Sequence, residues 1–214
     1  EKLLKSYYAK KEGIDPEKMY VVSVMPCVAK KFEKTREEMK NDGLANVDSV
    51  ITTRELARMI KRANIDFANL EKSKFDDPMG EATGAGAIFG TTGGVMEAAL
   101  RTAYETITGE ELKKLEFVDV RGKKGIKKAS IKIGDIDVKV AVAHGLGNAR
   151  KILEEIKSGK ADYQFVEIMA CPGGCIMGGG QPIKSSKTRA IYDVRTLRAK
   201  ELYTIDEKSK IRKS

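Results

Sequence analysis

The sequence contains few of the residues that build disulfide frameworks. There is no tryptophan, one histidine and three cysteines in 214 residues. A chain this long can bury a core without disulfides. An odd number of cysteines, two of them four positions apart, fits a reducing compartment and metal or redox chemistry better than disulfide pairing. Because the sequence has no secretory signal and no apolar run near 18 residues, we expect a cytoplasmic protein without a membrane span.

The positive charge is concentrated near one end. The formal net charge is +9, and residues 184–214 hold ten Lys or Arg against four Asp or Glu. Such an excess can steer an acidic partner toward a surface, and a merely solvated surface is the alternative. The basic residues are not interleaved with aromatic residues, and no nucleic-acid-binding motif occurs. We therefore expect no nucleic-acid partner.

The first third of the chain predicts alternating helix and strand. After an opening helix, residues 19–25 (MYVVSVM) form a β-branched run typical of a buried strand. Thr52 and Glu55 form a capping box, which predicts the start of a helix. The side chains expected to share one face of this helix are those of Leu56, Met59 and Ile60.

The middle of the chain holds a glycine-rich connection and a long helix. Residues 71–94 predict an irregular connection, which in a compact chain is usually functional or disordered. The helix is expected from Gly94 to Thr108, with Gly109 as its stop. Its core positions are expected at Met96, Ala99, Leu100, Ala103, Tyr104 and Ile107.

The next segments complete an α/β pattern. Residues 127–133 and 137–145 predict a β-hairpin around Gly134 and Asp135. A helix over 146–159 and a buried strand over 163–169 follow. The chain is therefore expected to be an α/β protein.

Cysteine follows two of the expected strands. Cys27 comes directly after the first strand, and Cys171 and Cys175 follow the last one in the sequence CPGGC. Ligands of open α/β sheets bind at the carboxyl ends of strands. Proline and two glycines favour a compact turn whose backbone N–H groups can approach an anion or a sulfide.

This spacing favours a cluster over common alternatives. Zinc modules usually repeat a Cys pair twice, and the third cysteine of the radical-SAM pattern is missing. Two cysteines that bind no metal remain the alternative at this stage. His144 is expected to be structural rather than a ligand. GAGAIFG departs from the dinucleotide fingerprint and follows no strand, so we expect no nicotinamide site.

Three stretches together resemble one enzyme family. MPCVAKKFE (25–33) and MACPGGCIMGGGQP (169–182) closely resemble the second and third signature motifs of the [FeFe]-hydrogenases, and AGAIFGTTGGVMEAALRTAYE (85–105) resembles the segment between those motifs. The resemblance covers nearly the whole chain and keeps the order and spacing of the motifs. It implies part of the catalytic, H-cluster domain of the large subunit, without the first cysteine motif and without the C-terminal tail.

The resemblance also implies an architecture. The fold is expected to be α/β and two-lobed, with small, mostly parallel sheets flanked by helices and the cluster between the lobes at strand carboxyl ends. We expect lobes at about residues 1–75 and 83–168. Residues 169–214 are then the cluster loop and the C-terminal segment.

The implied cofactor is the H-cluster, a [4Fe-4S] cubane joined to a diiron subsite that carries CO, cyanide and an azadithiolate. Cys27, Cys171 and Cys175 match cubane ligands, and Cys175 would also bridge to the diiron subsite. Lys30 matches the lysine that donates to a cyanide, a charge-assisted bond that satisfies a buried ammonium. The residues expected to surround the cofactor are Met25, Pro26, Phe89, Gly90, Met169, Gly178, Gly179 and Gly180.

The implied activity is the reversible reduction of protons to dihydrogen, in anaerobic hydrogen metabolism. The expected partners are ferredoxin or other electron-carrier subunits, iron–sulfur accessory domains and maturation proteins. The enzyme is expected to be linked to ferredoxin, or to NADH together with ferredoxin. The resemblance implies that the fourth ligand and a proton-exchanging cysteine belong to the first motif and that the rest of the proton relay also lies upstream, so we expect this chain alone to be inactive. A non-catalytic iron–sulfur assembly factor and an H2-sensing regulatory hydrogenase remain the alternatives.

Overall fold

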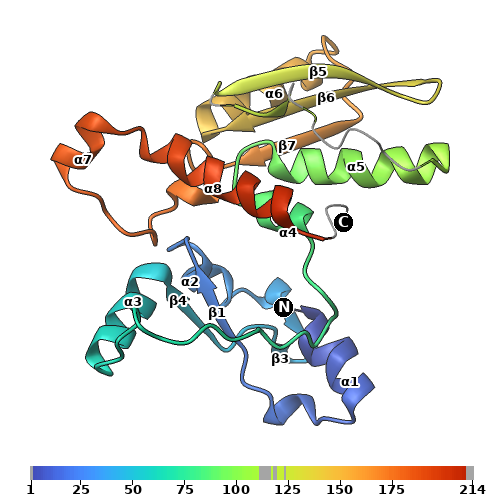
Figure 1. The fold of residues 1–214 in the computed structure, drawn as a ribbon. Coiled ribbons are helices and arrows are strands. Elements are labelled where there is room, and N and C mark those ends of the chain that lie inside the picture. The colour runs from blue at the N-terminus through green and yellow to red at the C-terminus, as the bar shows by residue number, and fades with distance from the viewer. Residues whose placement is uncertain (1, 111–116, 118–119, 123, 211–214) are drawn as a thin grey trace. The chain divides into compact units, whose positions relative to one another are not determined.

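The computed structural model describes residues 2–110, 117, 120–122 and 124–210. It divides into two units, each with its own core: Glu1–Glu81 with Gly178–Ile183, and Ala82–Met177 with Lys184–Ser214. They are called the first and the second unit below. Both combine small sheets with flanking helices (Figure 1), so the predicted α/β class is confirmed. No helix within the described ranges is both long and apolar enough to cross a bilayer.

The first unit is built on two parallel strands. β1 (Val22–Met25) pairs with β4 (Ser49–Thr52), and Met25 lies opposite Thr52. Its small core consists of Val21, Val47 and Val50, with Leu4 and Met25 packed against them. The other elements are η1 (Leu4–Tyr8), α1 (Ala9–Glu12), η2 (Pro16–Lys18), α2 (Lys30–Glu33), η3 (Glu37–Met39), β2 (Lys40–Asn41), β3 (Leu44–Ala45) and α3 (Thr53–Arg62).

Helix α3 begins where the sequence predicted. The Thr52 side chain accepts a bond from the Glu55 N–H, and the Glu55 carboxylate accepts from the Thr52 N–H, so the capping box is confirmed. On the predicted apolar face, Leu56 and Ile60 are half-buried, whereas the Met59 side chain is 55% exposed. No residue of α3 is fully buried, so within this unit the helix is held mainly by its first turn.

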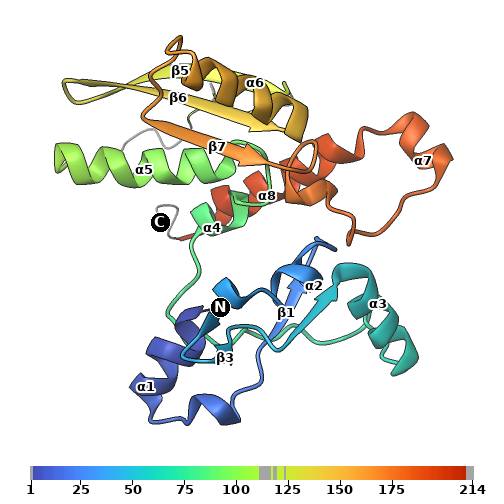
Figure 2. The same ribbon diagram turned by 180° about the vertical axis from the view of Figure 1, so that it is seen from behind.

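The second unit contains a three-stranded sheet. β5 (Ile126–Ile133) and β6 (Ile136–His144) form the predicted antiparallel hairpin, and β7 (Phe165–Met169) pairs parallel to β6. Helices α5 (Gly94–Thr108) and α6 (Leu146–Lys157) lie on opposite faces of this sheet (Figures 1 and 2). The α5 side of the core holds Met96, Leu100, Val120, Ile131, Ile133, Val140 and Val142, and the α6 side holds Ala141, Ala143 and Ile152.

Three parts of the second unit differ from the sequence expectation. The glycine-rich connection contains a short helix, α4 (Gly84–Ile88), capped by Thr83. The basic C-terminal segment forms α7 (Ser186–Ile191) and α8 (Val194–Lys208), which the charge pattern did not predict. On α5, Ile107 is 49% exposed, whereas Glu97 and Arg101 are completely buried.

Candidate metal centre

Cys27 lies in the first unit, directly after β1. The glycines of the third motif pack against the backbone before it: the Gly180 N–H donates to the Pro26 carbonyl at 2.8 Å. A Cβ on Gly180 would lie 2.9 Å from the Met25 carbonyl oxygen, so only glycine permits this approach. The structure thereby joins residues more than 150 positions apart in the sequence, and Cys27 is left half-buried at the end of its strand.

Arg54 fixes the same glycines from α3. Its Nη2 donates to the Gly179 carbonyl at 2.7 Å, and its backbone N–H donates to the Gly180 carbonyl. Gly178 is buried. The predicted glycine run is therefore held on the first unit beside Pro26. The sequence did not identify Arg54, because nothing in the α3 pattern distinguishes it from a solvated arginine.

Lys30 is the first residue of α2, close to Cys27 in the first unit. Its Nζ donates to Glu33 Oε1 at 2.6 Å, and its side chain is 38% exposed. Lys30 also lines a cavity of about 210 Å³ in this unit, together with Ser23, Lys34 and Asn46. An ammonium has three donors, so the bond to Glu33 does not prevent Lys30 from donating to another acceptor. Its predicted role stays a prediction.

The Cys171–Cys175 turn lies in the second unit, after β7. Gly173 and Gly174 have φ values of 91° and 101°, which glycine adopts without a steric penalty. The turn is bonded to the segment after α4: the Thr92 N–H donates to the Gly173 carbonyl and the Ile176 N–H donates to the Gly90 carbonyl. Cys171 is half-buried and Cys175 is exposed. The predicted Gly90 and the CPGGC motif thus form one bonded substructure.

The remaining residues singled out by the sequence differ in how far they are buried. Met25 packs against the core of the first unit. Met169 ends β7, and its carbonyl accepts from the Gly145 N–H. Phe89 follows α4 and is 45% exposed. His144 is buried at the end of β6. The contacts of the two methionines and Phe89 with a cofactor stay predictions.

Gly174→Ala is expected to destabilise the turn severely. Its Cβ would lie 2.7 Å from both the Gly90 carbonyl oxygen and the Thr92 nitrogen. Gly122 is a matched control, because its φ is also 101° but a Cβ there meets nothing within 4 Å. A positive φ costs a non-glycine residue about 1–3 kcal/mol, and overpacking adds about 1–3 kcal/mol. Urea unfolding should therefore show a larger loss for Gly174→Ala than for Gly122→Ala. Equal losses would contradict the close packing.

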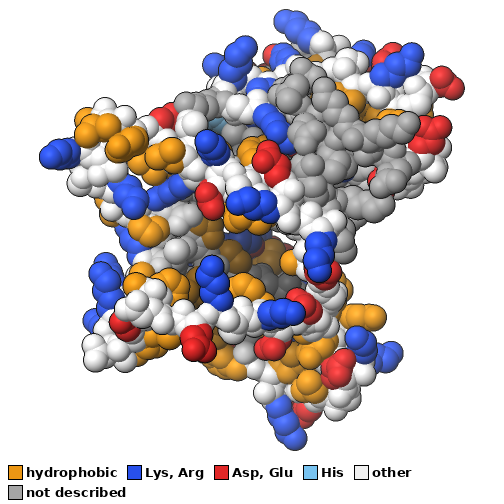
Figure 3. Space-filling view, in the orientation of Figure 1, with side chains coloured by type: hydrophobic (Ala, Val, Ile, Leu, Met, Phe, Trp, Pro, Cys, Tyr) orange, Lys and Arg blue, Asp and Glu red, His pale blue; other side chains and the backbone are white. Residues whose placement is uncertain are grey.

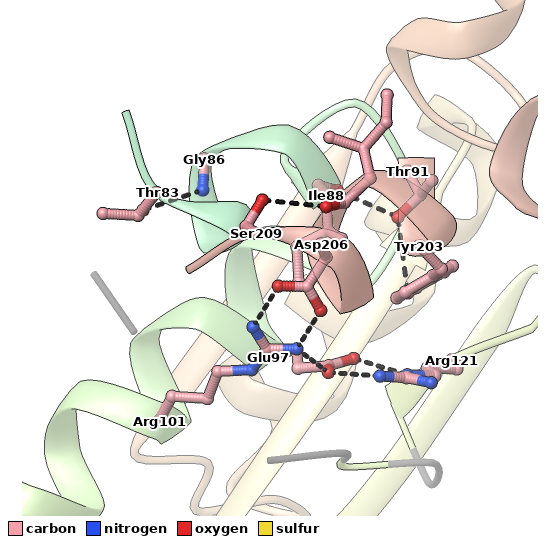
Figure 4. A network of polar contacts seen from close by, with 11 residues as sticks. Thr83, Gly86, Ile88, Thr91, Glu97, Arg101, Arg121, Tyr203, Asp206 and Ser209 are labelled. Atoms are coloured by element: carbon pink, nitrogen blue, oxygen red, sulfur yellow. Dashed lines mark hydrogen bonds and ion pairs between the residues drawn. The ribbon is translucent and has the colours of Figure 1, made fainter. Parts of the chain in front are cut away.

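A network of buried charges lies within the second unit (Figure 4). Arg101 donates to Asp206 at 2.9 and 2.8 Å and to Glu97 at 2.6 Å, and all three side chains have no exposed surface. Arg121 donates twice to Glu97 and stacks on the Tyr203 ring at 4.2 Å. Desolvation alone would lower the pKa of Arg101, but the bonds to Asp206 and Glu97 raise it above its ordinary value. The network is charge-balanced, and it joins α5 to α8.

Two further charged side chains of the second unit, those of Glu167 and Lys127, are buried. The Glu167 carboxylate accepts from the Gly93 and Met96 N–H groups at the start of α5, at 2.6 and 2.8 Å, where the helix dipole favours an anion. Lys127 Nζ donates to the Thr92 and Gly122 carbonyls. Burial lowers the pKa of Lys127 to about 8. Sequence reasoning missed both, since alternation on a strand does not show which charged residue faces inward.

The surface over α7 combines apolar and basic side chains, as Figure 3 shows on one face of the molecule. Ile191 and Tyr192 are 63% and 55% exposed, and Lys187 and Arg189 are also exposed. The predicted excess of positive charge is therefore present at the surface of this segment.

The candidate ligands are cysteine sulfurs, which iron–sulfur clusters bind as thiolates. All three cysteines are thiols rather than half-cystines. Within the described ranges, no group of three His, Cys, Asp or Glu could hold a metal ion, and Cys27 belongs to one unit while Cys171 and Cys175 belong to the other. The chemistry fits three of the four thiolates that a cubane requires.

Comparison with known proteins agrees with the motifs. A family model described as "Iron only hydrogenase large subunit, C-terminal domain" matches residues 2–179. The chain is 54% identical over 212 residues to the NADP-reducing hydrogenase subunit HndD of Solidesulfovibrio fructosivorans, covering 99% of this chain and 35% of that protein. It is 32% identical over 184 residues to the cytosolic Fe-S cluster assembly factor narfl of Xenopus tropicalis, covering 84% of this chain and 39% of that protein.

A solved structure supports the same relationship. The fold matches a variant of the [FeFe]-hydrogenase HydA1 from Chlamydomonas reinhardtii with a TM-score of 0.76 and 42% identity, over 99% of this chain and 59% of that one. The chain thus spans little more than a third of the length of the two curated relatives. By its motifs, its fold and its match over residues 2–179, the chain belongs to the family of the C-terminal domain of the iron-only hydrogenase large subunit.

Proposed function

We propose that the full-length protein containing this chain interconverts two protons and two electrons with one molecule of dihydrogen at an H-cluster. The observation that carries the proposal is the Cys171–Cys175 turn, in a chain of the hydrogenase family. The turn has two glycines at positive φ, Gly173 and Gly174, and is bonded to Gly90 and Thr92. When bound, the cluster supplies iron sites at which protons and electrons combine and a cubane that delivers the electrons.

The three cysteines bind the cofactor in this proposal. Cys27, Cys171 and Cys175 supply thiolates to the cubane, and the fourth thiolate comes from a part of the protein outside residues 1–214. Cys175 is in addition the protein ligand of the diiron subsite. The glycines of both motifs allow backbone N–H groups to approach an anionic cluster closely.

Lys30 orients the diiron subsite in this proposal by donating to an anionic cyanide. Glu33, which accepts from Lys30 in the structure, is the competing acceptor. Met25, Phe89 and Met169 exclude water from the subsite, because apolar and polarizable side chains lower the local dielectric. Pro26, Gly90, Gly178 and Gly179 form backbone contacts with the cofactor.

The proposal also covers the electron carriers, the maturation and the localisation of the protein. Ferredoxin, or an NADH-linked electron carrier, exchanges electrons with the protein through iron–sulfur accessory domains. Maturation proteins insert the diiron subsite, and the protein is cytoplasmic. The higher identity to the hydrogenase subunit, 54% against 32% for the assembly factor, favours an enzyme over a non-catalytic assembly factor.

Hydrogen turnover tests the proposal. The full-length protein is produced together with hydrogenase maturation factors, and H2 formation is measured with a reduced low-potential electron carrier. Lys139→Met is a neutral control, because it removes an exposed ion pair with Asp162, and such pairs contribute little to stability. We expect H2 formation by both proteins. Protein that binds iron and sulfide but neither forms nor oxidises H2 would instead support the assembly-factor alternative.

A further inference from the structure

Helix α8 lies against the back of the Cys171–Cys175 turn, within the second unit (Figures 1 and 2). It begins at Val194, beyond residues 2–179 that match the family model. The helix also packs against the segment after α4, since Leu202 leaves no space for a side chain at Gly90. Gly90 in turn accepts from the Ile176 N–H. One helix therefore contacts both the turn and the segment to which the turn is bonded.

Arg198 on α8 bonds directly to the turn. Its Nη1 donates to the Ile176 carbonyl at 2.7 Å, and Ile176 follows Cys175 in the chain. The N–H of Ile176 donates to the Gly90 carbonyl at 3.0 Å. Both polar groups of this residue are thus fixed, one by a charged donor and one by the backbone. One turn earlier on α8, the methylenes of Arg195 cover Gly173.

The far end of α8 is anchored by the buried charge network. Asp206 receives both bonds from Arg101 of α5, and its side chain has no exposed surface. A Cβ at Gly84 would collide with Asp206, so α4 is in close contact with the anchor. Between the two ends, Tyr203 stacks under Arg121 and accepts from Thr91 Oγ1. These contacts fix α8 along its length, and with it the position of Arg198.

We propose that Arg198 is a positioning residue for the cofactor: its bond to the Ile176 carbonyl holds the Cys175 turn in the geometry in which its thiolates bind the cluster, with α8 as the support. The inference rests on the proposed function for the identity of the cofactor. The Arg198–Ile176 bond joins two groups of the polypeptide and does not involve the cofactor. Its effect on the turn can therefore be measured without any cluster.

Amide hydrogen exchange of the cluster-free, full-length protein is the first test, read on the peptide over residues 171–177. Loss of a hydrogen bond from a charged donor is expected to speed exchange there about tenfold or more in Arg198→Met. Arg198→Lys keeps a charged donor and should remain close to wild type. Lys200→Met is the charge-matched control, because Lys200 is an exposed residue of the same helix and its replacement removes the same charge. The buried strand over Val140–Ala143 serves as internal reference.

The second readout is the midpoint potential of the cubane in the cluster-loaded protein. We expect a shift in Arg198→Met that Arg198→Lys largely reverses and that Lys200→Met does not reproduce. Wild-type exchange at 171–177 in Arg198→Met would overturn the inference. Faster exchange at Val140–Ala143 to the same extent would also overturn it, since Arg198 would then act on general stability. If the wild-type protein binds no cluster, the proposed function fails, while the exchange result still decides the role of Arg198 in the turn.

Discussion

Cys175→Ser is expected to abolish H2 formation in the full-length protein, by more than about a hundredfold, and to remove the infrared bands of bound CO and cyanide. In the proposed function, Cys175 is the single covalent protein ligand of the diiron subsite. Even the partners that merely orient metal ligands contribute about 10–100-fold, so loss of a bridging ligand should exceed that range. Infrared spectra and H2 assays of protein matured in parallel measure the effect.

Cys27→Ser is the matched comparison. Cys27 is expected to bind the cubane alone, and a cubane that loses one terminal thiolate can take the serine oxygen or water instead. This variant should retain part of the CO and cyanide bands. Equal band intensities in Cys175→Ser and Cys27→Ser would contradict the bridging role. Urea unfolding of both variants should be close to wild type before cluster insertion, because Cys27 is half-buried and Cys175 is exposed.

Asp206→Asn is expected to destabilise the protein strongly, with or without a cluster. The side chain keeps its shape, but Arg101 loses an anionic partner in a site where neither side chain has exposed surface. Removing one member of a buried pair costs roughly 3–5 kcal/mol, whereas replacing both members with apolar residues is often nearly neutral. The double variant Arg101→Met with Asp206→Leu should therefore recover much of the loss, and Glu97 keeps both bonds from Arg121.

Urea unfolding followed by circular dichroism measures this coupling. Lys139→Met, which breaks an exposed pair, should change the free energy of unfolding by no more than about 1 kcal/mol. Additive losses for Arg101→Met and Asp206→Leu would show that the pair is not coupled. Such a result would contradict the claim that the Arg101–Asp206 pair fixes the position of α8.

Short-range sequence patterns correctly predicted a helix start, a hairpin turn and the ends of two strands. The capping box at Thr52 and Glu55 began α3, and the turn at Gly134 and Asp135 joined the two strands of the hairpin. Both strands expected to precede cysteine end directly before Pro26 or shortly before Cys171. Glycine-rich motifs also showed where the backbone makes close contacts, as Gly174 and Gly180 confirm.

The contacts that depend on distant residues were not predictable from local pattern. Glu97 and Arg101 are four residues apart on a helix, a spacing that usually indicates an exposed ion pair. They are buried because Asp206, more than 100 residues later, completes the network. Arg198 lies in a segment whose charge suggested either a surface that attracts an acidic partner or a merely solvated one. Its role depends on a carbonyl group 22 residues away.

Lys30 illustrates the limit of motif reasoning at the site. The family motif assigns it a cyanide, whereas its own neighbours in KKFEK suggest a surface charge. In the structure its Nζ donates to Glu33 and its side chain is partly exposed, which fits both descriptions. The motif carries information about a cofactor that the polypeptide geometry alone does not contain.

Iron anomalous diffraction from crystals of the matured, full-length protein locates the cofactor directly. We expect an iron–sulfur cubane with iron atoms bonded to the Sγ atoms of Cys27, Cys171 and Cys175, and a separate pair of iron atoms bonded to the Cys175 Sγ. Iron bound at other residues, or a cubane without a diiron pair at Cys175, would contradict the proposed function.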